Sequence, residues 1–103
     1  MPAAVFLDSV KYSEEPTNYD ETLFNIFPNP AIEQLIIKPR IGFEAESRIL
    51  IYDLIGKVLH EEYDKLSMGN EKIIDLRSFA SGIYYIRITT CKEIFIENFI
   101  IIK

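Results

Sequence analysis

The chain has 103 residues, enough for one domain, and 49 % of them are hydrophobic, which predicts a packed core and excludes a disordered chain. Its net charge of −5, from 11 basic and 16 acidic residues without any basic run, argues against binding to nucleic-acid phosphates. The single cysteine, Cys91, excludes an internal disulfide, and the longest apolar run, 3–7, is far shorter than the roughly 20 residues of a membrane helix, as is the run 99–102.

Residues 1–20 differ in composition from the rest of the chain. The stretch "SVKYSEEPTNYDE" is polar and contains Pro16, so it is typical of a linker. The preceding "AAVFLDSV" fits either an extra strand or the end of an upstream region. The start also lacks the basic region and long apolar core of a secretory signal peptide. We therefore expect 1–20 to be a junction and the folded domain to occupy 21–103.

From residue 22 onward, apolar residues alternate with polar ones, as in strands with one buried face. The stretches are rich in Ile, Tyr, Phe and Thr, no helical spacing is present, and turn residues separate them. This pattern predicts an all-β fold, an Ig-like antiparallel β-sandwich of about seven strands. The predicted strands are 22–27, 33–39, 47–54, 57–64, 71–76, 82–90 and 93–102.

The stretch "NIFPNP" ends the first of these strands abruptly. Pro28 and Pro30 fix their own φ, favour extended backbone at the residue before each, and cannot donate to a sheet ladder. Asn29 between them can cap a turn with its side chain. We predict a rigid corner that protects a sheet edge from pairing with other chains.

Three later stretches have the composition of reversals. In "YDLIGK", Asp53 can accept a backbone hydrogen bond, and Gly56 can take the positive φ of a tight hairpin. A second reversal is predicted around Gly69. In "DLRSFASGIY", Leu76 and Phe79 are expected to reach the core through one turn of 3₁₀ helix.

The inventory of reactive side chains does not predict an enzyme. His60, the only histidine, is expected on a surface or an edge, and Cys91 near a strand end. One histidine and one cysteine form no zinc cluster of known spacing. Glu61 and Glu62 are adjacent, so they point to opposite faces of a strand and form no acid–base pair. Glycine-rich phosphate loops are also absent, so no cofactor and no metal are expected.

Three stretches in order, "FNIFPNPAIEQLIIK", "ILIYDLIGKVL" and "IDLRSFASGIYYIRI", are followed by a final apolar strand. Together they resemble the type A C-terminal sorting domain of the type IX (Por) secretion system of Bacteroidota. The resemblance covers about residues 22–103. The residues that match its motifs are Pro28, Asn29, Pro30, Tyr52, Asp53, Gly56, Lys57, Asp75, Gly82 and Tyr84, and Lys103 supplies the basic charge of the tail.

The resemblance implies a non-catalytic address at the end of an exported protein. It implies that the domain directs an attached cargo across the outer membrane and is cleaved off during surface attachment or release. The implied partners are the outer-membrane type IX translocon, a sortase-like peptidase and the upstream cargo. The implied location is the periplasm in transit, then the cell surface or the exterior.

Two further alternatives stay open at this stage. An accessory Ig-like module that binds carbohydrate or protein would need exposed aromatics, for which the candidates are Tyr52, Tyr63, Tyr84 and Tyr85. The strand 93–102 is apolar on both faces, so we expect it in the centre of the sandwich, the alternative being an edge held ready for a partner strand. The isolated chain is expected to be a monomer, and a strand-paired dimer is the other option.

Overall fold

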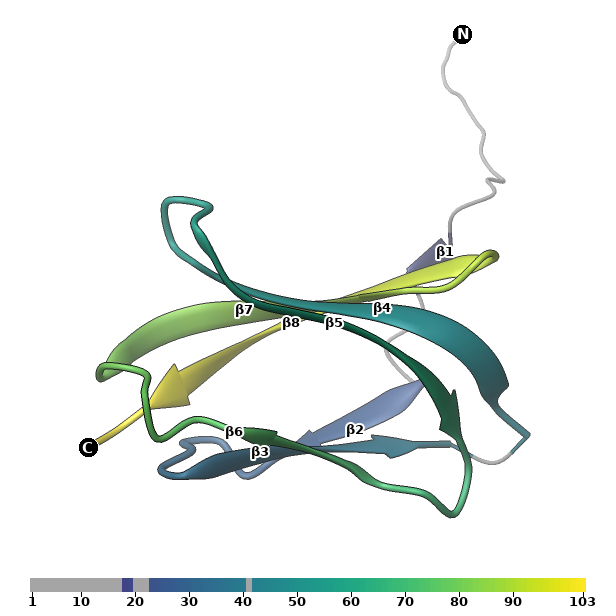
Figure 1. Ribbon diagram of the computed structural model, residues 1–103, viewed down its shortest axis with the longest axis horizontal. Helices are drawn as coiled ribbons and strands as arrows, with labels where there is room; N and C mark the ends of the chain where they lie inside the picture. Colours follow the sequence, from purple (N-terminus) through teal and green to yellow (C-terminus); the bar gives the residue numbers. More distant parts are fainter. Residues whose placement is uncertain (1–17, 20–22, 41) are drawn as a thin grey trace, which may run out of the picture.

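The protein is a sandwich of two β-sheets, and the computed structural model describes residues 18–19, 23–40 and 42–103 (Figure 1). One sheet has the strand order β1-β8-β7-β4-β5, and the other has the order β2-β3-β6. All pairs are antiparallel except the short parallel pair of β1 with β8. The strands are β1 (Asn18–Tyr19), β2 (Phe24–Phe27), β3 (Gln34–Pro39), β4 (Glu44–Asp53), β5 (Val58–Ser67), β6 (Lys72–Asp75), β7 (Gly82–Thr89) and β8 (Glu93–Ile101).

The core lies between the two sheets and follows from the alternation in the sequence. Along β7, Tyr84, Ile86 and Ile88 are buried, whereas the residues between them are half-buried on the outer face. As predicted, Tyr84 and Tyr85 therefore lie on opposite faces of the strand. Fully buried side chains come from both sheets, with less than 2 % of their surface exposed: Phe99, Leu35, Ile37, Ile49, Ile51, Leu66, Ile74, Leu76, Ile86, Ile88 and Ile101.

The predicted all-β sandwich and its seven strands are confirmed, with two differences in length. β4 begins three residues earlier than expected, at Glu44, and β5 runs three residues further, to Ser67. Leu66 is the one large apolar residue among the six that are added, and it is buried, so the alternation of apolar residues is too short to predict these ends. They pair with each other, with Glu44 opposite Ser67, and an ion pair of 2.7 Å joins Lys65 to Glu44.

The expectation that 93–102 lies in the centre of the sandwich is confirmed for its inner face and wrong for its outer face. On the side away from β7, the described partners of β8 are the two residues of β1 and an isolated bridge from Ala31 to Ile101. Phe95 and Phe99 are buried on the inner face, whereas Ile96 and Ile100 on the outer face are 40 % and 42 % exposed. The strand is apolar on both faces, but only one face is covered.

Two turns behave as the sequence predicts, and one differs slightly. Gly69 has φ +91°, within a reversal where the Asn70 N–H donates to the Ser67 carbonyl. Leu76 is fully buried and Phe79 packs against the core. The link between them is one hydrogen-bonded turn, with the Phe79 N–H donating to the Leu76 carbonyl at 2.9 Å, and not a 3₁₀ helix.

The segment predicted as a junction, 1–20, lies outside the described residues except for β1. That strand pairs Asn18 with Glu93 and Tyr19 with Ile94. A search of the described residues for a helix long and apolar enough to cross a membrane finds none.

Candidate functional site

The turn between β4 and β5 is held in shape by one carboxylate. The Oδ1 atom of Asp53 accepts hydrogen bonds from the backbone N–H groups of Ile55 at 3.0 Å and Lys57 at 2.9 Å. The Asp53 N–H donates to the Lys57 carbonyl, and Gly56 takes φ +91°, where a side chain would be strained. These contacts confirm the predicted roles of Asp53 and Gly56 in the turn.

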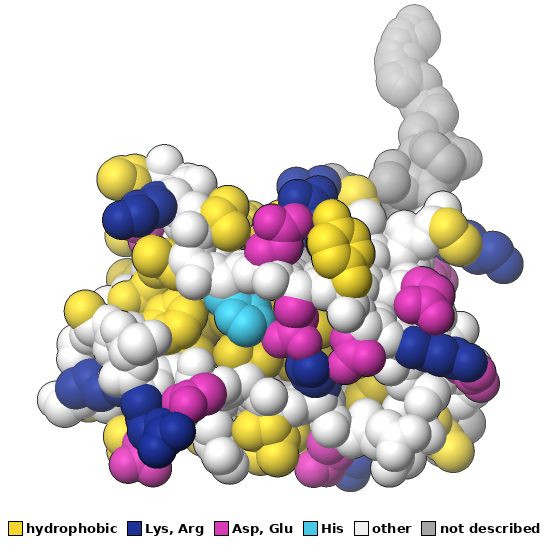
Figure 2. Space-filling view, in the orientation of Figure 1, with side chains coloured by type: hydrophobic (Ala, Val, Ile, Leu, Met, Phe, Trp, Pro, Cys, Tyr) yellow, Lys and Arg dark blue, Asp and Glu magenta, His cyan; other side chains and the backbone are white. Residues whose placement is uncertain are grey.

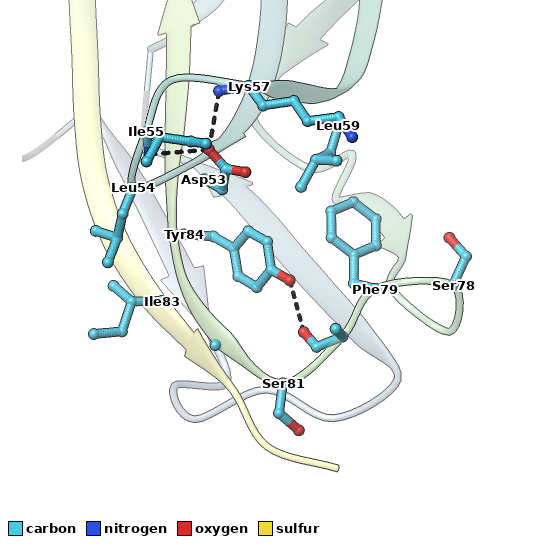
Figure 3. A pocket seen from close by; sticks show the side chains of 12 residues that line it. Asp53, Leu54, Ile55, Lys57, Leu59, Ser78, Phe79, Ser81, Ile83 and Tyr84 are labelled. Atoms are coloured by element: carbon cyan, nitrogen blue, oxygen red, sulfur yellow. Dashed lines mark hydrogen bonds between the residues drawn. The ribbon is translucent and has the colours of Figure 1, made fainter.

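A groove of about 500 Å³ lies between this turn and the segment that leads into β7. In Figure 1 the turn, this segment and the C-terminal end of β8 come together at the left end of the sandwich. Figure 3 shows Leu54 and Ile83 on one side of the Tyr84 ring, and Leu59 and Phe79 on the other. The groove is therefore lined on both sides by apolar side chains from two separate segments, 53–59 and 78–84.

Tyr84 at the centre of the groove is a fixed part of the core. Its hydroxyl donates to the Ala80 carbonyl at 2.7 Å (Figure 3). Its ring packs edge-on against Phe79, with 5.5 Å between ring centroids, and stacks on Phe99 at 5.9 Å. Only 6 % of Tyr84 is exposed. Because its one polar atom already has a partner, Tyr84 supplies shape to the groove more than hydrogen bonding.

The rim of the groove exposes large aliphatic side chains and one cation. Leu54 is 62 % exposed and Ile55 is 89 % exposed, because the turn carries them beyond the end of β4. Figure 3 shows the side chain of Lys57 running toward Leu59, with its amine away from the Asp53 carboxylate. No acidic side chain of the described residues forms an ion pair with this amine.

The corner at Pro28–Pro30 lies against the last strand. The Asn29 Oδ1 atom accepts a hydrogen bond from the Ile100 N–H at 3.0 Å. The Ala31 N–H donates to the Ile100 carbonyl at 2.8 Å, and the Ile102 N–H donates to the Ala31 carbonyl at 2.9 Å. The predicted edge-protecting corner therefore exists on β8 of the other sheet. The expected local cap by Asn29 is wrong, because its partner lies 71 residues away.

The C-terminal residue is tied down beside the same strand end. The side-chain amine of Lys103 donates to the Leu76 carbonyl at 2.9 Å, and the backbone N–H of Lys103 donates to the Ser81 Oγ atom. Nearby, Asp75 pairs with Arg77 at 2.8 Å. Hydrogen bonds from the Arg77 side chain and backbone lower the pKa of Asp75 from 3.8 to about 2, and the Lys103 charge adds to this. The only basic residue of the tail thus has partners on the domain itself.

The structure sorts the predicted site residues into two groups. Four of them, Asp53, Lys57, Gly82 and Tyr84, line the groove. Tyr52 and Gly56 lie on the same hairpin, while Pro28, Asn29, Pro30 and Lys103 surround the end of β8, with Asp75 at the end of β6.

The aliphatic residues of the rim were missed by the sequence interpretation. The available signal was the pair Leu54–Ile55, two large apolar residues inside a turn, where polar residues are usual. Ile83 and Phe79 carried no such signal, because each also fits a strand or a core position.

The residues considered for catalysis lie on different faces and elements of the sandwich. His60 lies on the edge strand β5, as expected, with its Nε2 atom 2.6 Å from Glu62 Oε1. Glu61 on the opposite face pairs with Arg48 at 2.8 Å. Cys91 is exposed and free. Among the described residues, no group of three or more His, Cys, Asp or Glu side chains could hold a metal ion.

His60 belongs to an ion-pair cluster that joins the edges of the two sheets. Lys72 on β6 contacts Glu62 and lies 3.0 Å from Asp64, both on β5. Burial raises the pKa of Glu62, but hydrogen bonds from Lys72 and His60 outweigh it, so the net pKa is lowered. The hydrogen bond to Glu62 raises the pKa of Lys72 despite partial burial. Figure 2 shows this side, with the histidine in cyan among acidic and basic side chains.

The four candidate tyrosines, all within the described residues, do not form one continuous exposed row. Tyr52 and Tyr85 stack on the outer face of the five-stranded sheet at 5.5 Å, and both are half-buried. Tyr63, 71 % exposed, pairs instead with Arg48, whose guanidinium lies 5.9 Å from its ring centroid. The fourth candidate, Tyr84, is buried in the core.

Comparison with known proteins gives one match. The family model described as "Secretion system C-terminal sorting domain" matches residues 25–103, which is most of the chain and includes every described strand except β1 and the start of β2. No curated protein and no solved structure matches the chain.

Proposed function

The chain belongs to the secretion system C-terminal sorting domain family, and from this premise we propose that it carries an attached cargo protein across the outer membrane and is cleaved off during surface attachment or release. The family match is the observation that carries this proposal. Membership indicates a secretion sorting signal that contacts the export machinery and its cargo. The route through the periplasm, the type IX translocon and the sortase-like peptidase are the finer parts of the proposal.

The arrangement of the motif residues supports a recognition role. Lys57 and Tyr84 are 27 positions apart in the chain, and the pairing of β4 with β7 brings both to one groove. Two other motif residues hold the end of the last strand, through Asn29 at Ile100 and Lys103 at Leu76. Recognition of the domain by the export machinery requires a fixed surface. The residues of the groove supply this surface, and the residues around the end of β8 support it.

The domain acts without catalysis of its own in this proposal. Its one histidine is engaged with Glu62 at the edge of the sandwich, and Cys91 lies exposed in a turn. A nucleophile of this kind would need a neighbouring base and hydrogen-bond donors for an oxyanion. The chemistry of cleavage is therefore assigned to the peptidase, with this chain as substrate.

An accessory binding module is the alternative function. A carbohydrate platform uses aromatic rings that are exposed side by side, whereas here the stacked pair Tyr52–Tyr85 is half-buried and Tyr63 lies apart. The exposed apolar surface gathers at the groove and is mainly aliphatic. These features favour the sorting function over sugar binding.

The test is export of a fluorescent passenger that has its own signal peptide and ends in the whole 103-residue chain. It is expressed in a type IX-competent host and in a translocon-defective strain of the same host. We expect passenger on the surface or in the medium of the competent host only. Passenger that stays in the periplasm of both strains would contradict the proposal and favour a binding module.

A further inference from the structure

The rim of the groove is the richest concentration of exposed apolar side chains in the described residues. Twelve large hydrophobic side chains of the described residues are exposed. Five of these twelve belong to the rim or to the adjoining start of β5: Leu54, Ile55, Val58, Leu59 and Ile83. Single exposed apolar residues are ordinary on a protein surface, but a cluster of this kind marks an interaction site. We propose that the groove docks a protein segment that inserts a large apolar side chain and carries a carboxylate beside it.

The shape and lining of the groove fit a side chain of a protein. Its volume of about 500 Å³ is in the range of sites that enclose a ligand group, and it is open on one side. Leu54 and Ile83 face Leu59 and Phe79 across the Tyr84 ring (Figure 3). An aliphatic or aromatic side chain placed between them would be covered on both sides. Burial of that kind is how a few anchor residues dominate the affinity of an interface.

The groove is poorly suited to a sugar. Two of the polar groups that line it are already engaged, since the Tyr84 hydroxyl donates to the Ala80 carbonyl and Asp53 Oδ1 accepts two N–H groups. The rim also lacks an exposed flat aromatic ring, since its outermost members are Leu54 and Ile55.

The charge at the rim specifies the partner further. Lys57 places an amine at the mouth of the groove with no acidic partner among the described residues. An unpaired cation beside an apolar surface is complemented by a carboxylate on the bound segment. Lys57 is also the only basic residue among those that line the groove. Its amine is therefore the positive charge with which an incoming segment can pair.

This inference rests on the proposed sorting function, and it gives the chemistry of the surface that reads the domain. The first test compares the double variant Leu54→Ser/Ile55→Ser with the matched control Ile32→Ser/Met68→Ser. All four residues are more than half exposed, so none contributes much to the core. In the passenger assay, we expect export by the groove variant to fall about tenfold, and export by the control to match the parent chain.

The second test addresses the charge. Lys57→Glu should lower export about tenfold, because it places a carboxylate against the carboxylate of the partner. Lys57→Arg keeps the positive charge and should export like the parent. Lys38→Glu is the control for net charge. Lys38 is exposed on the outer face of β3, which belongs to the three-stranded sheet and not to the sheet that carries the β4–β5 turn. Thermal unfolding of each purified chain checks that the fold is retained.

The possible outcomes separate this inference from the function on which it rests. If the parent chain is exported and the groove variants are exported equally well, the groove is not the docking site, although the sorting function stands. A loss of export in both groove and control variants would also overturn the inference, because it would show a general sensitivity to surface changes. If Lys57→Glu is exported like the parent while Leu54→Ser/Ile55→Ser is not, the proposal that the partner carries a carboxylate beside Lys57 is refuted. If the parent itself is retained in the periplasm, the sorting function fails first.

Discussion

β5 and β8 lie toward opposite edges of the same sheet, and different physics holds each of them. The inner face of β8 carries Phe95, Phe99 and Ile101, all at least 98 % buried. The inner face of β5 carries His60, Glu62 and Asp64 before its first buried residue, Leu66, and its link to the opposite sheet is the ion-pair cluster with Lys72. One strand is fixed by burial of apolar surface, and the other by paired charges.

The two strands are also protected from pairing with other chains in different ways. Charges on an edge strand discourage pairing with another chain, and β5 has them on both faces, with Glu61 paired to Arg48 and Glu62 to Lys72. β8 has the opposite composition, since Ile94, Ile96 and Ile100 share its outer face. Its protection comes from other segments, β1 at the start and the corner Asn29–Ala31 at the end. The comparison teaches that a corner from the other sheet can occupy the free hydrogen-bonding groups at the end of an apolar strand.

The largest expected effect tests the apolar anchor of β8. Phe99→Ala should lower the free energy of unfolding by about 3–5 kcal/mol, because it leaves a cavity between the sheets. The matched aromatic on β5 is Tyr63, which is mostly exposed. Tyr63→Ala should cost below about 1 kcal/mol, the value of an exposed contact with Arg48. Urea denaturation of both variants measures the difference, and similar losses would refute the contrast between the two strands.

A smaller effect is expected at the corner. Asn29→Ala removes the acceptor of the Ile100 N–H, which should cost about 1 kcal/mol because the site is partly exposed to water. Hydrogen exchange of the Ile100 amide should speed up more than that of Ile102, whose acceptor is the Ala31 carbonyl. Asn25→Ala, on the exposed outer face of β2, is the control. Unchanged exchange at Ile100 would show that Asn29 does not protect the edge.

Much of the fold was predictable because alternation along a single strand is a local property. The strand bounds, the Asp53–Gly56 turn and the opposite faces of Tyr84 and Tyr85 all follow from residues close in sequence. The extensions of β4 and β5 have only Leu66 as a large apolar residue, and they pair with each other across the ladder, where Lys65 lies 2.7 Å from Glu44. The position of β8 in its sheet could not be predicted from the sequence either, since an apolar strand has the same composition whether or not a neighbour covers it.

The candidate site was predictable only in part. The matching motifs pointed to Lys57, Gly82 and Tyr84, but nothing local indicated that they meet. Their meeting depends on the register of β4 with β7, which places Asp53 opposite Tyr84. Likewise, the partner of Asn29 lies 71 residues away, a contact that depends on how the two sheets stack. Sequence reasoning identified residues of the site, and tertiary pairing decided which of them act together.

The smallest expected effect tests whether ion pairs hold β5 against the opposite sheet. Lys72→Met removes the ion pairs to Glu62 and Asp64 and should cost about 0.5–1 kcal/mol at pH 7, since the pairs are partly solvated. Because the pKa values of Glu62 and Asp64 are lowered on folding, their contribution is complete above their ordinary values of 4.5 and 3.8 and is lost as the pH falls through the folded values. The raised pKa of Lys72 has the opposite consequence, so its contribution is complete below 10.5 and is lost as the pH rises through the folded value.

The difference in unfolding free energy between the parent and Lys72→Met should therefore be largest between about pH 5 and pH 10 and shrink on both sides. Urea denaturation at several pH values measures this difference directly, because carboxylates elsewhere titrate equally in both chains. The control is Lys38→Met, which removes an exposed amine with no ion pair among the described residues, and its difference from the parent should stay close to zero. A Lys72→Met difference that does not change below pH 4 would mean that β5 is held by packing of the lysine stem and not by charge, and the contrast with β8 would then be one of degree.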